Sequence, residues 1–131
     1  MSTNYVVIVE KYAERHFISK FKRKYKGAWN VTWNALVEEF KRIDTLIGAT
    51  SIAETIADVG NIKICKTEFR VHGTQESRHR SGNRCIVAVH KDSCTVHVLV
   101  VYHKNDLSWS NETASWKALV KENYSEYEKM M

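Results

Sequence analysis

The residues with the greatest capacity for chemistry stand at the two ends of a predicted β-hairpin, residues 84–104. Two apolar, β-branched runs flank a short polar break at residues 91–93, which is typical of a β-hairpin. Arg84 begins the first run, and His103 and Lys104 end the second. The first strand of an antiparallel hairpin starts beside the end of the second strand. We therefore expect a guanidinium, an imidazole and an ammonium group at one end of a sheet, where they could bind a polyanion and transfer a proton.

Each of these residues also has a structural interpretation. Arg84 could bind phosphate through its planar guanidinium, or it could pair with a nearby carboxylate such as Glu68 or Asp106. Arg70, on the preceding predicted strand, has the same two interpretations. Glu68 could act as a general base or serve only as an ion-pair partner, and His103 could be catalytic or structural. The sequence leaves these alternatives open.

The surrounding cations extend the possible anion-binding surface. Lys63 and Lys66 by themselves suggest solvent-facing strand residues, and Arg78 and Arg80 fall in a polar loop at residues 72–83. Residues 20–26 carry five Lys or Arg residues on a predicted helix. Such a helix is usually a solvated face, and it would bind an RNA backbone only if it lies on the same side as the end of the sheet.

Composition limits the class of protein. The chain of 131 residues has a net charge of +5 and 44% hydrophobic residues, which suits one globular domain spanning residues 1–131. Residues 61–107 hold twice as many Lys and Arg as Asp and Glu residues, together with five of the six histidines. A basic sheet fits a nucleic acid or an acidic protein partner. A basic surface without a specific partner is the alternative.

Several classes of site and location are not expected. The sequence has no apolar run of the ~20 residues that cross a bilayer, and its first residues lack the basic region of a signal peptide. We therefore expect a cytoplasmic protein without membrane contact. Cys65, Cys85 and Cys94 lack the paired spacing of zinc ligands, and we expect buried, reduced thiols. No glycine-rich phosphate loop or metalloprotease motif is present, so no metal or cofactor is predicted.

The hydrophobic pattern predicts an α+β domain. Helices grouped before sequential strands indicate a helical hairpin packed on a curved antiparallel β-sheet, in the order β-α-α-β-β-β-α, with the other sheet face free to stay open. Residues 48–60 are predicted as a short helix capped by Ser51 and Glu54, or as an ordered loop. The predicted elements are a strand at 5–9, a helix from 12 that Gly27 ends, a helix at 30–46, strands at 62–71, 84–90 and 94–104, and a helix at 112–124.

The last predicted strand is apolar on both sides, which indicates a central strand. Strict alternation places His97 and His103 together on one face. The two predicted faces are Val96, Val98, Val100 and Tyr102 on one side and Thr95, His97, Leu99, Val101 and His103 on the other.

These segments resemble the RelE/ParE superfamily of toxins from type II toxin–antitoxin systems. Residues 83–89 look like the family strand that begins with an arginine and continues with aliphatic residues. Residues 98–104 look like its last sheet strand, which ends in a basic or histidine-bearing motif, and residues 69–71 are similar to an earlier strand with a functional basic residue. In architecture the resemblance covers most of the chain and implies a RelE/ParE-like fold.

The resemblance implies a metal-independent endoribonuclease that cleaves mRNA, usually on the translating ribosome, and so inhibits translation. A cognate antitoxin protein would cover its basic surface. By similarity to the YoeB branch, Glu68 would be the general base, Arg84 would stabilise the charged phosphate, and His103 would be the general acid. The implied RNA-binding residues are Lys63, Lys66, Arg70, Arg78, Arg80 and Lys104.

Two other functions remain open at the level of sequence. A ParE-like inhibitor of DNA gyrase would share the fold and would have no need of an imidazole at the strand end. A basic RNA-binding or protein-binding module would bind with strong salt dependence and leave RNA intact.

Overall fold

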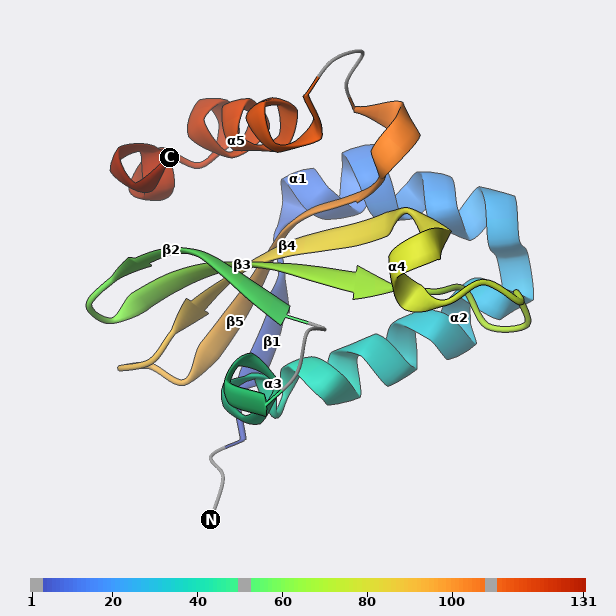
Figure 1. Cartoon of the computed structure of the whole chain (residues 1–131), viewed down its shortest axis with the longest axis horizontal. Helices are drawn as coiled ribbons and strands as arrows, with labels where there is room; N and C mark the ends of the chain where they lie inside the picture. The colour runs from blue at the N-terminus through green and yellow to red at the C-terminus, as the bar shows by residue number, and fades with distance from the viewer. Residues whose placement is uncertain (1–3, 50–52, 108–110) are drawn as a thin grey trace.

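The computed structural model describes residues 4–49, 53–107 and 111–131. Helices lie against a five-stranded mixed sheet, which makes the fold α+β, as predicted (Figure 1). The elements in chain order are β1 (Val6–Val9), α1 (Lys11–Ala13), η1 (Glu14–Ile18), α2 (Ser19–Phe40), α3 (Ile43–Ala49), β2 (Ala53–Val59), β3 (Ile62–Phe69), α4 (Arg78–Ser81), β4 (Asn83–His90), β5 (Thr95–His103), η2 (Lys104–Asp106), α5 (Glu112–Asn123) and η3 (Ser125–Met130).

The sheet has the strand order β1-β5-β4-β3-β2. The β4–β5 hairpin and the central position of β5 are as predicted, because the hydrophobic runs and the polar break between them are local signals. The prediction of a fully antiparallel sheet is wrong, since β1 pairs with β5 in parallel, Val6 beside Thr95. Parallel neighbours need a long crossover, and here the connection runs through residues 10–94 and includes β2, β3 and β4.

The helical hairpin forms from one nearly continuous run of helix, residues 11–40. Lys26 interrupts it with φ 35° and ψ −117°, so α2 bends back on itself and its two arms diverge from that point (Figure 1). The predicted stop at Gly27 is therefore one residue late. None of the described helices combines the length and the apolarity needed to cross a membrane.

The segment predicted as a short helix or loop contains a strand instead. β2 pairs antiparallel with β3, and a bulge at Ile56 shifts the register between Thr55 and Ala57. The helix-capping signal is local, whereas strand formation depends on pairing with a partner strand that the local pattern does not show. Here the pairing with β3 outweighs the capping signal. The predicted cap at Ser51 lies outside the described residues.

Both faces of the sheet are covered, so the second face, which the sequence left free to stay open, is not open. On one face, hereafter the hairpin face, Trp29, Leu36 and Phe40 of α2 pack on the strands. On the other, hereafter the α5 face, Trp116 and Val120 of α5 pack on Ile64, Ile86, Ala88 and Tyr102, with Tyr127 of η3. Figure 1 shows α5 and η3 lying over the sheet on the side away from α3 and the second arm of α2.

A bulge in β5 changes which residues share a face. Ile86 pairs with Val100 and Val87 pairs with Val98, so Leu99 is an extra residue in the ladder. Leu99 and Val100 both contact the α5 face, whereas Val98 and Val101 both contact the hairpin face. An extra residue reverses the alternation beyond it. The prediction that His97 and His103 share a face is therefore wrong.

Candidate functional site

Glu68 and Arg84 are direct neighbours across β3 and β4. Both side chains are on the α5 face at the end of the sheet, because Arg84 also pairs with Tyr102 of β5. Arg84 Nη1 lies 3.1 Å from Glu68 Oε2, and the exposed fractions of the side chains are 5% and 18%. Of the two sequence-level interpretations of Arg84, the ion pair with Glu68 is the one observed.

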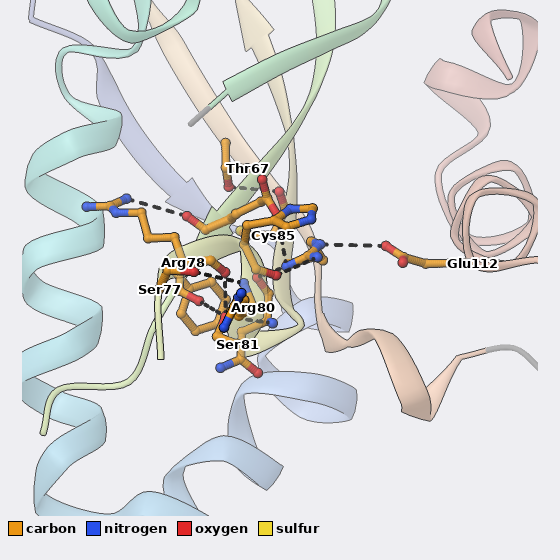
Figure 2. Close-up of polar contacts among 12 residues, drawn as sticks. Thr67, Ser77, Arg78, Arg80, Ser81, Cys85 and Glu112 are labelled. Atoms are coloured by element: carbon orange, nitrogen blue, oxygen red, sulfur yellow. Dashed lines mark hydrogen bonds and ion pairs between the residues drawn. The ribbon is translucent and has the colours of Figure 1, made fainter. Parts of the chain in front are cut away.

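The guanidinium of Arg84 is held by further contacts. Nη1 donates to the carbonyl of Asn83 at 3.2 Å, and Nη2 donates to the carbonyl of His79 at 3.1 Å. Nε lies 3.8 Å from Glu112 Oε2 and has no hydrogen-bond acceptor among the described residues. Figure 2 shows Glu112 reaching the cluster from the side of α5. The arginine is thus a buried, fixed positive charge with one unused N–H group.

An imidazole reaches the same carboxylate from α4. His79 Nδ1 lies 2.8 Å from Glu68 Oε2, and the His79 side chain is 83% exposed. The Ser77 side chain caps this short helix by accepting from the Arg80 amide, which satisfies one of the free amides at a helix start. Ser81 anchors the same turn by donating to the Phe69 carbonyl at 2.6 Å. The turn therefore holds His79 over the end of β3.

Tyr102 and Glu112 complete the inner side of the site. Tyr102 donates its hydroxyl to Glu112 Oε2 at 2.6 Å. Burial, with the hydrogen bond to Glu112 as a second cause, raises the pKa of Tyr102 well above its usual range, which keeps this donor protonated. We call Glu68, His79, Arg84, Tyr102 and Glu112 the Glu68 cluster.

His103 is not part of this cluster. His103 pairs with Asn83, and Asn83 pairs in turn with Phe69, whose side chain is on the hairpin face. His103 is therefore also on the hairpin face, opposite to Arg84. Its half-buried ring packs on Gly82, where an added Cβ would lie 2.6 Å from Nε2. The expected meeting of Arg84 and His103 in one pocket is therefore wrong: Arg84 is paired with Tyr102, and successive residues of a strand point to opposite faces.

The predicted RNA-binding residues divide into three groups. Lys66 is on the same face of β3 as Glu68, two residues away, and exposed Lys104 follows β5. Lys63 is on the hairpin face, 3.9 Å from Asp58, and is not near the cluster. Of the remaining three, Arg78 and Arg80 belong to α4 and Arg70 follows β3; Arg80 is exposed, and Arg70 and Arg78 line a cavity beside α2.

Sequence reasoning missed His79, Tyr102 and Glu112 as members of the site. The triplet Arg78-His79-Arg80 stands out in the sequence, but nothing in it indicates that a short helix folds the imidazole onto Glu68. Glu112 is 44 positions from Glu68 and arrives only through the packing of α5 on the sheet. These are tertiary contacts without a local signal.

The cluster combines the groups needed to move protons next to an anion. A carboxylate and a solvent-exposed imidazole share a short hydrogen bond, so either can accept or release a proton. The buried guanidinium beside them supplies positive charge in a region of low dielectric, where it acts strongly on a developing negative charge. This arrangement is suited to acid–base chemistry on a phosphate.

The thiols do not contribute to the cluster. Cys65 and Cys85 are buried and free, and Cys94 is half-buried. Burial raises the pKa of Cys65 to about 11 and raises that of Cys85 still further, which leaves both thiols protonated and unreactive. Within the described ranges, no group of His, Cys, Asp and Glu residues has the geometry to hold a metal ion.

Comparisons with known protein families, with curated proteins and with solved structures found no match to this chain. Function must therefore be inferred from the chemistry of the site and from the charge of the surfaces around it.

Proposed function

We propose that the protein is a metal-independent endoribonuclease that cleaves mRNA and acts as the toxin of a type II toxin–antitoxin system. The observation that carries this proposal is the contact of one carboxylate, Glu68, with both an exposed imidazole and a buried guanidinium. The same three chemical groups were expected from the resemblance to the YoeB branch. His79 takes the place that the sequence suggested for His103.

In the proposed reaction, Glu68 accepts the proton of a ribose 2′-hydroxyl as the 2′-oxygen attacks the adjacent phosphorus. The bond from phosphorus to the 5′-oxygen breaks, and His79 in its protonated form gives that oxygen a proton. Arg84 stabilises the extra negative charge on the phosphorane. The His79–Glu68 contact must open when RNA enters, and the exposure of the imidazole permits this movement.

A basic surface lies at the same end of the molecule as the Glu68 cluster. Lys20 and Phe21 of α2 line a cavity with Val101 and Tyr102, at the end of β5. The ring of Phe21 also lies 5.7 Å from that of Phe69, at the end of β3. The helix with the five cations at residues 20–26 therefore begins beside the end of the sheet, and this location supports a role in binding an RNA backbone. We call its exposed cations the basic arm: Lys11, Arg15, Lys20, Lys22, Arg23, Lys24 and Lys26.

The proposal includes a fold family, a cellular location and a protein partner. A helical hairpin on a sheet that ends in a basic site is compatible with a RelE/ParE-like fold. A toxin of this kind would act in the cytoplasm on mRNA at the ribosome, and a cognate antitoxin would neutralise it by covering the basic arm and the Glu68 cluster.

A non-enzymatic binding module is the second candidate, and one observation favours it. Three groups already surround the Arg84 guanidinium, and its side chain is almost fully buried. An arginine in that state can be purely structural, because removing it from its carboxylate would leave a buried charge without a partner. Such a module would bind RNA or a protein partner without chemistry.

The test compares cleavage by the wild type, His79→Ala and His103→Ala. Purified protein is incubated with 5′-labelled mRNA that is free in EDTA and, in a separate assay with magnesium present, with mRNA on translating ribosomes; cleavage is followed on sequencing gels. We expect His79→Ala to slow cleavage by roughly 100-fold or more and His103→Ala to keep the wild-type rate. His79 is exposed, so its removal should leave the melting temperature unchanged.

Two outcomes would contradict the proposal. Cleavage that needs His103 and not His79 would contradict the proposed site. Intact RNA in both assays, with tight binding retained, would establish the binding module. Glu68→Gln is a weaker test by itself, because it also removes the charge that compensates buried Arg84.

A further inference from the structure

A second cavity lies beside the Glu68 cluster, between α2 and the segment that follows β3. Its volume is about 660 Å³. The floor is apolar, and hydroxyl, imidazole and guanidinium groups stand around it. The lining residues used below are Ala35, Glu39, Phe69, Arg70, His72 and Arg78.

The cavity and the Glu68 cluster share one wall. Consecutive residues alternate between them: Glu68 belongs to the cluster and Phe69 to the cavity, and His79 belongs to the cluster and Arg78 to the cavity. Arg78 Nη1 also donates to the Glu68 carbonyl at 3.4 Å. In Figure 2, Arg78 extends toward α2, away from Glu112. The cluster is therefore on the α5 face and the cavity on the hairpin face, and a chain bound to the cluster would reach the cavity by passing around the end of β3 beside α4.

The cavity wall is rigid and offers hydrogen bonds. Arg78 binds Glu39 of α2 through two parallel contacts of 2.7 and 2.9 Å. We call this ion pair the Glu39–Arg78 fork. It joins α4 to α2 at the cavity, and such paired contacts fix the orientation of both side chains. The His72 amide donates to Thr32 at 2.7 Å, which ties the segment after β3 to the same helix. The walls are thus held in place without a ligand.

The charges around the opening favour an anionic chain. Arg70 and His72 are exposed at the cavity, and Arg80 is exposed on the adjacent turn of α4. Glu39, the carboxylate that lines the cavity, is already neutralised by Arg78. A flat apolar body joined to phosphates matches an apolar floor with cations at the rim, and single-stranded RNA presents bases in this way.

We propose that this cavity holds the nucleobase next to the cleaved phosphodiester, and so selects single-stranded RNA in the neighbourhood of the cut. The assignment rests on the nuclease function proposed above. It gives the Glu39–Arg78 fork a role in positioning the base, and it gives Arg70 a role at the adjacent phosphate.

The test fills the cavity from a position that does not disturb the core. Ala35 is exposed on α2 and lines the cavity, so Ala35→Trp would occupy it. The matched control is Asn34→Trp, at the neighbouring exposed position that is not part of the lining. The ligands are fluorescent four-nucleotide strands with 2′-deoxy sugars, which cannot be cleaved, and versions with one abasic position each. Affinity is measured by anisotropy.

We expect one abasic position to weaken binding to the wild type and to Asn34→Trp by about tenfold, corresponding to about 1.4 kcal/mol for the interaction with one base. Ala35→Trp should bind the intact strand more weakly by a similar factor, and that abasic position should cause no further weakening. If the abasic position weakens binding to Ala35→Trp as much as it weakens binding to the wild type, the assignment is overturned. Binding that no abasic position affects would overturn it as well.

The two proposals can fail separately. If mRNA is cleaved, and each abasic position weakens binding to Ala35→Trp as much as it weakens binding to the wild type, the assignment of the cavity as a base pocket is wrong and the nuclease function stands. If Ala35→Trp abolishes the effect of one abasic position and no RNA is cleaved, the cavity binds a base and the proposed nuclease function is wrong. If an acidic peptide binds and none of the oligonucleotides does, the cavity is a protein-docking site and the assignment is overturned.

Discussion

At the scale of single residues, the close contact of His103 with Gly82 defines the end of the β4–β5 hairpin. Gly82 has φ 76°, in the left-handed region that favours glycine. The His103 ring lies so close to Gly82 that a Cβ on this residue would not fit beneath it. The Lys104 amide donates to the Gly82 carbonyl at 2.8 Å, so the two strand ends are joined at this glycine. His103 thus has a packing role that accounts for its position.

Gly82→Ala should therefore be destabilising for two separable reasons. The left-handed backbone costs about 1–2 kcal/mol for a residue with a Cβ, and the clash with His103 adds to it. The free energy of unfolding, measured in urea, should fall more for Gly82→Ala than for Gly73→Ala, where φ is 89° and the space is open. In the His103→Ala background the two decreases should become similar. An unchanged difference would show that the packing of His103 on Gly82 is unimportant.

At the scale of elements, the bend in α2 depends on strained backbone at Lys26. Its φ of 35° and ψ of −117° are rarely adopted by a residue with a side chain. The bend lets the first arm cover the end of the sheet while the second arm returns across the hairpin face. Strain of this kind persists only where the surrounding packing requires it.

Lys26→Gly should stabilise the protein, because glycine adopts this conformation without strain. We expect a gain of about 1 kcal/mol in the free energy of unfolding. Lys24→Gly removes the same charge from a regular helical position and should lower the stability by about 1 kcal/mol. Chemical denaturation of both variants gives the comparison. Equal decreases in stability for the two variants would mean that the bend carries no strain.

At the scale of the whole molecule, positive charge is concentrated where the sheet ends. Lys20 of the basic arm lines a cavity with Tyr102, Lys66 shares a strand face with Glu68, and α4 carries Arg78 and Arg80, whereas α5 and η3 carry acidic and basic residues in similar numbers. Each cation that binds a phosphate releases counterions, so this distribution predicts RNA binding that depends strongly on salt.

Replacing Lys20, Lys24 and Lys26 by Gln should make RNA binding less sensitive to salt. The slope of log K against log salt for single-stranded RNA should become shallower by roughly 0.7 for each phosphate that the variant no longer binds, or about 2 in total. The control replaces Lys117, Lys121 and Lys129 of α5 and η3 by Gln, which removes the same charge elsewhere and should leave the slope nearly unchanged. Equal slopes for the two triple variants would exclude the basic arm as the binding surface.

The sequence by itself determined the elements whose signals are local. The helical hairpin, the β4–β5 hairpin with its polar turn, the central β5 and the burial of Cys65 and Cys85 follow from hydrophobic runs and their breaks, whereas Cys94, also expected to be buried, is only half-buried. It also named Glu68, together with Asp106, as a possible ion-pair partner of Arg84, and the pair with Glu68 is the one observed.

Only the tertiary structure decided which side chains meet. The extra residue Leu99 reverses the alternation in β5 and places His103 on the opposite face from Arg84. A one-residue change of register moves every later side chain to the other face, and the pattern Val98-Leu99-Val100-Val101 is apolar throughout and gives no sign of where it occurs. His79 and Glu112 reach Glu68 and Arg84 through the docking of α4 and α5 on the end of the sheet. Contacts between segments far apart in the chain depend on packing, which local sequence patterns do not specify.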